Sequence, residues 1–297
     1  MKLFFKKIIT VSFLGIILFT KSASAEAVPA KVVGVVPQFS HVVVVMLENH
    51  SYNQVVGSKT MPYYNALIKK YGLAQNYFAN AHPSIGNYFM LTTGKIITND
   101  DNFTGTTTED NIAREITAAG KSWKVYAEGL PSTGYVGGST KLYMKRHNPF
   151  AYFGDVRSSL SEKNNIVPFT IFSKDVSDNK LPNFSFIVPD ACNDAHDCKL
   201  VTTDNWLKKN IDPLINDSNF KNGGLLAIVF DEGRAGDKLH GGGQDPVVLV
   251  GANVKSGFKS KVFYQHQNLL KTILVGLGIN KFPGATLVAK PMFDFFK

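Results

Sequence analysis

Four short stretches of this chain are almost entirely apolar and rich in β-branched residues. They cover residues 41–47, 182–188, 224–230 and 246–251. A strand that is apolar on both of its faces is typical of a parallel sheet covered by helices above and below. Residues 122–126 form a fifth, shorter stretch that also predicts a strand. We therefore expect an α/β fold of the three-layer α/β/α type, with a mainly parallel central sheet between two layers of helices.

The segments between these strands carry helical signals. Amphipathic spacing or a helix-ending glycine predicts helices over residues 61–71, 109–119, 205–215 and 266–276. Residues 129–140 and 233–245 are rich in Gly, Ser or Thr and should be loops. Helices between the strands agree with a single large α/β domain.

The N-terminus has the features of a secretory signal peptide. A basic start is followed by an apolar run over residues 8–19 and by Ala23-Ser24-Ala25. Cleavage after Ala25 would leave residues 26–297 as one catalytic domain, located in the periplasm or outside the cell. The alternative is an uncleaved N-terminal anchor. No other stretch is apolar enough to suggest a membrane span.

The charge balance gives only weak information about partners. The whole chain has a formal net charge of +9, and four lysines of residues 1–25 account for four of these charges, which leaves +5. The basic residues are dispersed and the aromatic residues fall mainly in core-like runs, so we expect no nucleic-acid partner. The oligomeric state does not follow from the sequence.

Ser84 lies at a sharp turn into a helix. It follows a proline, and apolar residues at helical spacing come directly after it. A hydroxyl at a helix N-terminus faces free backbone N–H groups, which suits both a nucleophile and an incoming phosphate. Asn87, one turn later, lies on the same helix face. The alternative interpretation is that Ser84 only caps the helix.

Acidic or amide residues follow three of the predicted strands. These are Glu48-Asn49, Asp190 and Asp231-Glu232. Ligands of open α/β sheets bind at the carboxyl ends of the strands. Clustered carboxylates repel one another unless a cation or a shifted pKa relieves them. We therefore expect a divalent metal ion (zinc, calcium or magnesium), although each acid alone could be a helix cap.

The only two cysteines, Cys192 and Cys198, close a short loop. In an exported protein a disulfide between them is the expected state, and a Cys/His metal site is the alternative. The disulfide would fix Asp194 and His196 within the loop. Together with Asp190 they form a candidate additional metal or catalytic group.

Basic residues and histidines elsewhere supply candidates for substrate contact. Lys145, Arg146 and His147 are consecutive and could grip a phosphoryl group or a lipid headgroup. A solvated basic turn is the alternative. His240 lies in the lid-like loop 233–245, and His266 opens the last predicted helix.

Three motifs resemble those of a known family. They are Glu48-Asn49-His50-Ser51-Tyr52, His82-Pro83-Ser84-x-x-Asn87-Tyr88 and Asp231-Glu232-Gly233. Over residues 40–280 the chain is similar to the phosphoesterase family of bacterial acid phosphatases and phospholipases C, within the alkaline phosphatase superfamily. The short form with its basic cluster and cysteine loop looks most like the small secreted acid phosphatases that act on monoesters, including phosphoinositides.

The resemblance implies a role for each matching residue. The metal ligands would be Glu48, Asn49, Ser84, Asp231 and Glu232. Ser84 would also be the nucleophile, and Asn87 would donate to a phosphoryl oxygen. His196 or His240 would protonate the leaving group. The remaining substrate contacts would come from Lys145, Arg146, His147 and His266.

The predicted function is therefore that of a secreted, metal-dependent phosphomonoesterase that forms a phosphoserine intermediate. Its substrate would be a small phosphoester or a phospholipid, with transient contact to a membrane surface. A phospholipase C acting on lipid headgroups is the alternative within enzymes. A secreted binding protein on a degenerate phosphatase fold is the alternative outside them, but the nucleophile and both acidic pairs are present.

Overall fold

The computed structural model describes Met1 and residues 35–297. Apart from Met1, the predicted signal peptide (1–25) lies outside the described residues. Within the described part of the chain, no helix is both long enough and apolar enough to cross a bilayer.

An eight-stranded sheet forms the centre of the domain. In spatial order it contains β5 (Ile166–Pro168), β4 (Trp123–Ala127), β6 (Phe184–Val188), β1 (His41–Leu47), β7 (Gly224–Phe230), β8 (Val247–Val250), β2 (Gly72–Ala74) and β9 (Lys259–Ser260). All neighbouring pairs are parallel except the two that involve β8. The predicted mainly parallel sheet is confirmed.

The central strands are apolar because helices cover both faces of the sheet. Side chains of β1 alternate between two cores: Val42, Val44 and Met46 belong to one, whereas Val43 and Val45 belong to the other. Every residue of β7 is buried. This two-sided burial explains why these strands read as continuous apolar runs rather than as alternating patterns.

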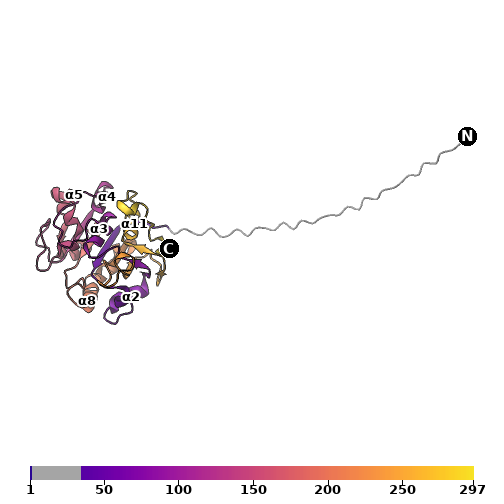
Figure 1. The fold of residues 1–297 in the computed structure, drawn as a ribbon, viewed down its shortest axis with the longest axis horizontal. Helices are drawn as coiled ribbons and strands as arrows, with labels where there is room; N and C mark the ends of the chain where they lie inside the picture. Colours follow the sequence, from indigo (N-terminus) through magenta and orange to yellow (C-terminus); the bar gives the residue numbers. More distant parts are fainter. Residues whose placement is uncertain (2–34) are drawn as a thin grey trace. The chain divides into compact units, whose positions relative to one another are not determined.

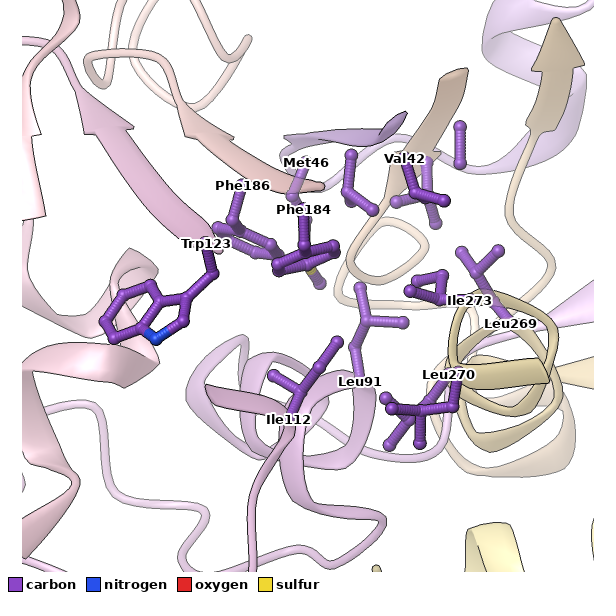
Figure 2. Packing of buried hydrophobic residues seen from close by; sticks show 14 of the residues in the cluster. Val42, Met46, Leu91, Ile112, Trp123, Phe184, Phe186, Leu269, Leu270 and Ile273 are labelled. Atoms are coloured by element: carbon purple, nitrogen blue, oxygen red, sulfur yellow. The ribbon is translucent and has the colours of Figure 1, made fainter. Parts of the chain in front are cut away.

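The first core lies between the sheet and α3 (Ile85–Thr93), α4 (Ile112–Ala118) and α11 (His266–Gly276). Figure 2 shows this packing, with Leu91 of α3 and Leu270 of α11 below the strand residues Val42 and Phe184. The second core lies under α2 (Pro62–Lys70) and α8 (Leu200–Asn210). Figure 1 shows α4 and α11 on one side of the sheet and α2 and α8 on the other.

The remaining elements are short. The helices are α1 (Tyr52–Val55), α5 (Gly154–Ser158), α6 (Leu160–Lys163), α7 (Phe172–Ser177), α9 (Asp212–Asn216) and α10 (Ser218–Gly223). The 3-10 turns are η1 (Lys145–His147), η2 (Pro149–Tyr152), η3 (Phe169–Ile171), η4 (Leu239–Gly241), η5 (Gly284–Leu287) and η6 (Phe293–Phe295). A separate two-stranded sheet pairs β3 (Tyr77–Phe78) with β10 (Tyr264–Gln265) in parallel.

Two helices were predicted with wrong bounds. The helix expected over 109–119 begins only at Ile112, where Asn111 caps it. The segment expected as a helix over 205–215 begins earlier, at Leu200, and its first helix ends at Asn210. A second helix, α9, then starts at Asp212 with Pro213 in its first turn. Because proline has no N–H to donate to the preceding turn, it interrupts the longer helix and starts the next one.

Candidate active site

The ends of β1 and β7 place two acidic pairs side by side. Leu47 is paired with Phe230 in parallel register, so Glu48 and Asp231 are the next residues of adjacent strands. The backbone N–H of Asn49 donates to Oδ1 of Asp231 at 3.1 Å. Asn49 has φ 49°, a left-handed conformation that asparagine tolerates better than most residues. The turn at Asn49 thereby directs the two pairs into one site.

Ser84 stands at the start of α3, but its hydroxyl does not cap the helix. The hydroxyl instead donates to Oε2 of Glu48 at 3.0 Å and lies 3.4 Å from Oδ1 of Asn49. The side chain is buried, with 3% of the residue's surface exposed. A serine that only capped α3 would accept a hydrogen bond from the first turn. The geometry therefore favours a chemical role over a structural one.

Oxygen atoms gather around the Asn49 side chain. Its amide position facing the acids lies 3.2 Å from Oε1 of Glu232 and 3.2 Å from Oε2 of Glu48. With the amide nitrogen there, it donates to both carboxylates. With the oxygen there, it completes a set of oxygens that includes the Ser84 hydroxyl. Oδ2 of Asp231 is buried and has no hydrogen-bond partner. Such a set of hard oxygen donors fits a divalent cation.

The electrostatics of the acids point to the same conclusion. Burial, together with the charges of Asp231 and Asp194, raises the pKa of Glu48 well above its usual value. Burial raises the pKa of Asp231 to about 7. Burial and the charge of Asp231 raise the pKa of Glu232 to about 10. A bound cation would stabilise the ionised forms of all three groups and remove the cost of bringing them together.

A second buried group adjoins the first through Glu48. His147 lies between Oε1 of Glu48, at 3.2 Å from its Nε2, and Oδ2 of Asp194, at 3.1 Å from its Nδ1. The Nε2 contact is close but not aligned as a hydrogen bond. Ligand atoms of these three residues lie within 4.8 Å of one another, so this group could also hold a metal ion. Burial, and then the nearby Arg146, lower the pKa of His147 well below its usual value, which favours the neutral ring.

The cysteine loop holds Asp194 in place. Cys192 and Cys198 form the predicted disulfide. Oδ1 of Asp190 accepts from the backbone N–H groups of Cys192 and Asn193, at 3.0 and 2.9 Å, and its backbone oxygen accepts from Asp194 at 2.9 Å, so Asp190 organises the loop. Among the described residues, its carboxylate makes no hydrogen bond to Glu48, Asp231 or Glu232, which we call the acidic cluster. The backbone of Asp194 accepts from the N–H of Glu48 at 2.8 Å. Burial raises the pKa of the Asp194 carboxyl to about 7.

We expect loss of the disulfide to affect activity more than stability. Because the cysteines are only six residues apart, cross-linking them removes little chain entropy, roughly 2 kcal/mol. Replacing both cysteines by serine should free Asp194 and lower turnover by about tenfold or more, since catalytic groups need precise placement. Turnover and thermal melting of the double variant, compared with the reduced native chain, check this. Native turnover in both would mean that the loop needs no cross-link.

The three residues of the basic cluster, Lys145, Arg146 and His147, lie in different surroundings. The Arg146 guanidinium lies 3.1 Å from Nε2 of His196 and 3.6 Å from Oδ2 of Asp101. Oδ1 of Asp101 accepts from the backbone N–H of Ile85, the residue after Ser84, at 3.2 Å. Arg146 therefore sits beside the N-terminus of α3. Lys145 is turned away, with its ammonium 4.3 Å above the Tyr152 ring.

Asn87 has partners other than the phosphoryl oxygen that the sequence predicted for it. The Asn87 amide joins α3 to the preceding loop: its oxygen accepts from the N–H groups of Asn80 and Ala81, and its nitrogen donates to Ala81 at 2.8 Å and to Glu232 at 3.4 Å. Asn87 is fully buried, so it positions the loop and Glu232 rather than presenting a free donor.

The histidines of the two later segments also differ from expectation. His266 is fully buried, with Nδ1 2.9 Å from the Tyr77 hydroxyl and Nε2 2.7 Å from the backbone oxygen of Asp231. Both ring nitrogens are thus occupied behind the acidic pair. The His240 ring packs against Phe78 and Phe263, with centroids 4.4 and 4.8 Å away. Within the described residues, it makes no hydrogen bond to the acidic cluster.

Sequence reasoning did not single out Tyr88 and His82. The Tyr88 hydroxyl donates to Oε1 of Glu48 at 2.5 Å, and the Tyr88 ring stacks on His147. His82 lies 3.0 Å from Oε2 of Glu232 through Nδ1, and its Nε2 meets the backbone oxygen of Asp237 at 2.7 Å. Both residues stand inside the motif around Ser84. Their proximity in sequence to Ser84 was the signal that could have identified them as site residues.

Two further acids were also missed because nothing in their local sequence marks them. Asp101 reaches the start of α3 from a surface loop. Asp245 is fully buried just before β8, and neither of its carboxylate oxygens has a hydrogen-bond partner. Burial and the charges of Asp231 and Glu232 raise its pKa well above the usual value. In the metal-free chain this raised pKa favours the protonated, neutral carboxyl of Asp245 behind the site.

The sequence is similar to that of known phosphatases. A model of the phosphoesterase family matches residues 58–279. The chain is 31% identical to a phosphatidylinositol-3-phosphatase of Mycobacterium tuberculosis over 262 residues, which cover 88% of this chain and 84% of that protein. It is 29% identical to a phosphate-repressible acid phosphatase of Penicillium chrysogenum over 270 residues, with 87% of this chain covered. The chain spans only 64% of that fungal relative.

The fold has solved counterparts. A protein of the alkaline phosphatase superfamily from Vibrio parahaemolyticus matches with a TM-score of 0.61, covering 86% of this chain and 71% of that one. At 12% sequence identity this likeness supports the fold alone.

Proposed function

Because this chain belongs to the phosphoesterase family and its relatives include phosphatases, it is a phosphoric monoester hydrolase, and we propose that it uses Ser84 as nucleophile beside a bound divalent cation. The observation that carries this proposal is the Ser84 hydroxyl. It stands at a helix N-terminus, yet it donates into the acidic cluster instead of capping the helix. A buried hydroxyl among acids has little structural use and a clear chemical one.

The chemistry proceeds in two displacements. The Ser84 oxygen attacks phosphorus while Oε2 of Glu48, which accepts the hydrogen bond of the hydroxyl at 3.0 Å, takes its proton. The bond between phosphorus and the leaving oxygen breaks, and that oxygen takes a proton from His196. A water molecule then attacks the phosphoserine and gives a proton to His196. The bond between phosphorus and the Ser84 oxygen breaks, Glu48 returns its proton to that oxygen, and phosphate is released. We assign the proton to His196 because its ring lies 6.0 Å from that of His147, whereas His240 contacts Phe78 and Phe263.

The proposed cation would be held by residues that already face one another. Its ligands would be Glu48, Asn49, Ser84, Asp231 and Glu232. When bound, a divalent cation lowers the pKa of the serine hydroxyl and offsets charge on the phosphoryl oxygens. Glu48 also contacts His147 and, through it, Asp194, so this second group either orients Glu48 or holds a further ion.

The phosphoryl group of the substrate would bind at the start of α3, where the electrostatic potential is positive. The backbone N–H of Ile85, in the first turn of α3, and the Arg146 guanidinium both face the Asp101 carboxylate. We propose that a phosphoryl oxygen competes with Asp101 for these donors. Arginine and a helix N-terminus are both well suited to bind phosphate.

The substrate and compartment are part of the proposal. The relative from M. tuberculosis is named for a phosphoinositide monoester, which makes a lipid or inositol phosphate a reasonable substrate class. We propose that the chain acts outside the cytoplasm, because the Cys192–Cys198 disulfide suits an oxidising compartment.

A substrate panel tests the function. Phosphate release from para-nitrophenyl phosphate and from a phosphoinositide monophosphate should exceed hydrolysis of bis-para-nitrophenyl phosphate by at least about tenfold in kcat/KM, the discrimination that about 1.4 kcal/mol of lost transition-state contact provides. Release of phosphocholine from phosphatidylcholine should be negligible. Faster cleavage of the diesters would instead identify a phospholipase C-type enzyme.

A further inference from the structure

Large apolar side chains are exposed on the C-terminal part of the domain. Leu239, Val262, Phe263, Leu287 and Val288 have 53%, 47%, 44%, 66% and 84% of their surfaces exposed. We call these five residues the apolar surface. Isolated exposed apolar residues are ordinary, but a connected group on a soluble domain marks an interaction site.

Three of the five residues line one cavity, and a fourth, Leu239, precedes His240, whose ring packs edge-on against Phe263. Val262, Phe263 and Val288 line a hollow of about 400 Å³ together with Lys290. The Phe263 ring lies 4.8 Å from that of His240, the residue after Leu239. Leu287 precedes Val288, and its backbone oxygen accepts from Lys271 of α11 at 3.2 Å. The apolar surface is therefore continuous rather than scattered.

The charge around this surface is strongly positive. Residues 255–297 contain seven lysines and one acidic residue, a net charge of +6. Residues 26–254 contain 21 basic and 22 acidic residues, a net charge of −1. The single acid, Asp294, already accepts hydrogen bonds from Ser260 and Tyr264. The whole positive excess of residues 26–297 thus lies in the segment that carries most of the apolar surface.

Three lysines beside the apolar surface, two of them from residues 255–297, are free to meet an external anion. Lys261 precedes Val262, Lys290 lines the same hollow, and Lys238 precedes Leu239. All three are exposed, and none forms an ion pair with any residue that the structure describes. Lysines beside apolar side chains can place their ammonium groups at lipid phosphates while the apolar groups enter the layer below.

We propose that the apolar surface and its flanking lysines dock the enzyme onto an anionic lipid membrane. A second copy of the chain is a poor occupant, because an isologous contact would bring the same unpaired lysines together. An anionic bilayer offers an apolar interior for the apolar side chains and negatively charged headgroups for the lysines. The surface binds the membrane through its own residues, so docking does not depend on the proposed catalysis.

Docking would bring the catalytic loop to the lipid. Leu239 lies in the loop 233–245, which directly follows Asp231 and Glu232. Gly242 and Gly243 of this loop exchange backbone hydrogen bonds with Ala79, shortly before Ser84. Leu239 of the apolar surface therefore lies in the loop that directly follows Asp231 and Glu232. A phosphomonoester headgroup in the bilayer would meet the enzyme on this side.

Vesicle sedimentation tests the proposal. The folded chain is mixed with vesicles of phosphatidylcholine alone, or of phosphatidylcholine with phosphatidylglycerol. We expect binding only to the anionic vesicles, and weaker binding at higher salt. The Lys261→Gln, Lys290→Gln variant should bind about thirtyfold more weakly, as expected for two lysines removed from an anionic surface. The matching Lys→Arg variant should bind like the native chain.

Matched control variants distinguish binding through the apolar surface from nonspecific membrane binding by any exposed apolar or basic residue. Phe263→Ser with Val288→Ser should reduce binding, whereas Leu160→Ser and Lys208→Gln, at exposed positions elsewhere, should not. All these variants should keep native turnover of para-nitrophenyl phosphate. Ser84→Ala should bind vesicles normally, so a failure of the catalytic proposal is distinguishable from a failure of docking.

Other outcomes would overturn the proposal. Equal binding to neutral and anionic vesicles, or unchanged binding in the glutamine variant, would remove the lysines from any membrane role. A dimer seen by sedimentation velocity that disappears in Phe263→Ser, Val288→Ser would assign the apolar surface to a second copy of the chain. Absence of vesicle binding at low salt would reject the proposal outright.

Discussion

Replacing Ser84 by alanine should lower kcat/KM for para-nitrophenyl phosphate by at least about a thousandfold, as expected when a nucleophile is removed. The fold should be almost unaffected, because the Ser84 hydroxyl makes no capping hydrogen bond to α3. Steady-state kinetics and thermal melting of the same preparation measure both effects. Trapping of radiolabelled phosphate on the native chain but not on the variant would identify the phosphoserine.

Ser159 provides the matched control. It also stands at a helix N-terminus, and its hydroxyl does cap: it accepts from the N–H of Glu162 at 3.3 Å. Ser159→Ala should therefore cost about 1 kcal/mol of stability and leave turnover unchanged. The two variants should thus show opposite patterns. Native turnover in Ser84→Ala would exclude Ser84 from the mechanism.

Removal of the proposed metal ion should abolish activity and make stability fall as pH rises. In the metal-free chain, the folded-state pKa values of Asp231 and Asp194 are raised to about 7, above the unfolded value of about 3.9. The folded state therefore binds more protons than the unfolded state between about pH 4 and pH 7. Stability contributed by these groups is full below pH 4 and is lost as pH rises through 7.

Melting temperatures of chelated and metal-supplemented protein across this pH range check the expectation. Added divalent ion should raise the melting temperature most at the high-pH end, where the acids are ionised, and should restore turnover. A chelated protein that melts at the same temperature from pH 4 to pH 8 would argue against the acidic cluster as a metal site. Full activity after prolonged chelation would argue against a catalytic ion.

Asp231→Asn separates the two roles of this carboxylate. The variant should lose activity, because a ligand charge is missing. At pH 8 its chelated form should melt at a higher temperature than the chelated native chain, since one buried charge beside Glu48 and Glu232 is gone. A residue that served stability alone would show the opposite sign. Asp212→Asn, at the start of α9, is the control. It should change neither the turnover nor the melting temperature by much.

The fold was predictable because burial acts on each strand separately. The runs 41–47 and 224–230 match β1 and β7 residue for residue, since a strand covered on both faces must be apolar throughout. The helix at 205–215 was misplaced because its start, at Leu200, follows the cysteine loop without a local capping residue. Short elements such as β9 and β10 have two residues each and leave no pattern to read.

The site was predictable only where the chain itself brings residues together or marks them with a motif. By itself the sequence determined the parallel sheet, the acids at its strand ends and the serine at a helix start, because each depends on local spacing or on burial. Tertiary structure decided which side chains meet. Ser84 and Glu48 are 36 residues apart, and Asn49 and Asp231 are 182 apart. Strand register and helix packing set those distances, and the same packing gave Asn87 and His266 buried partners and placed His147 between two acids.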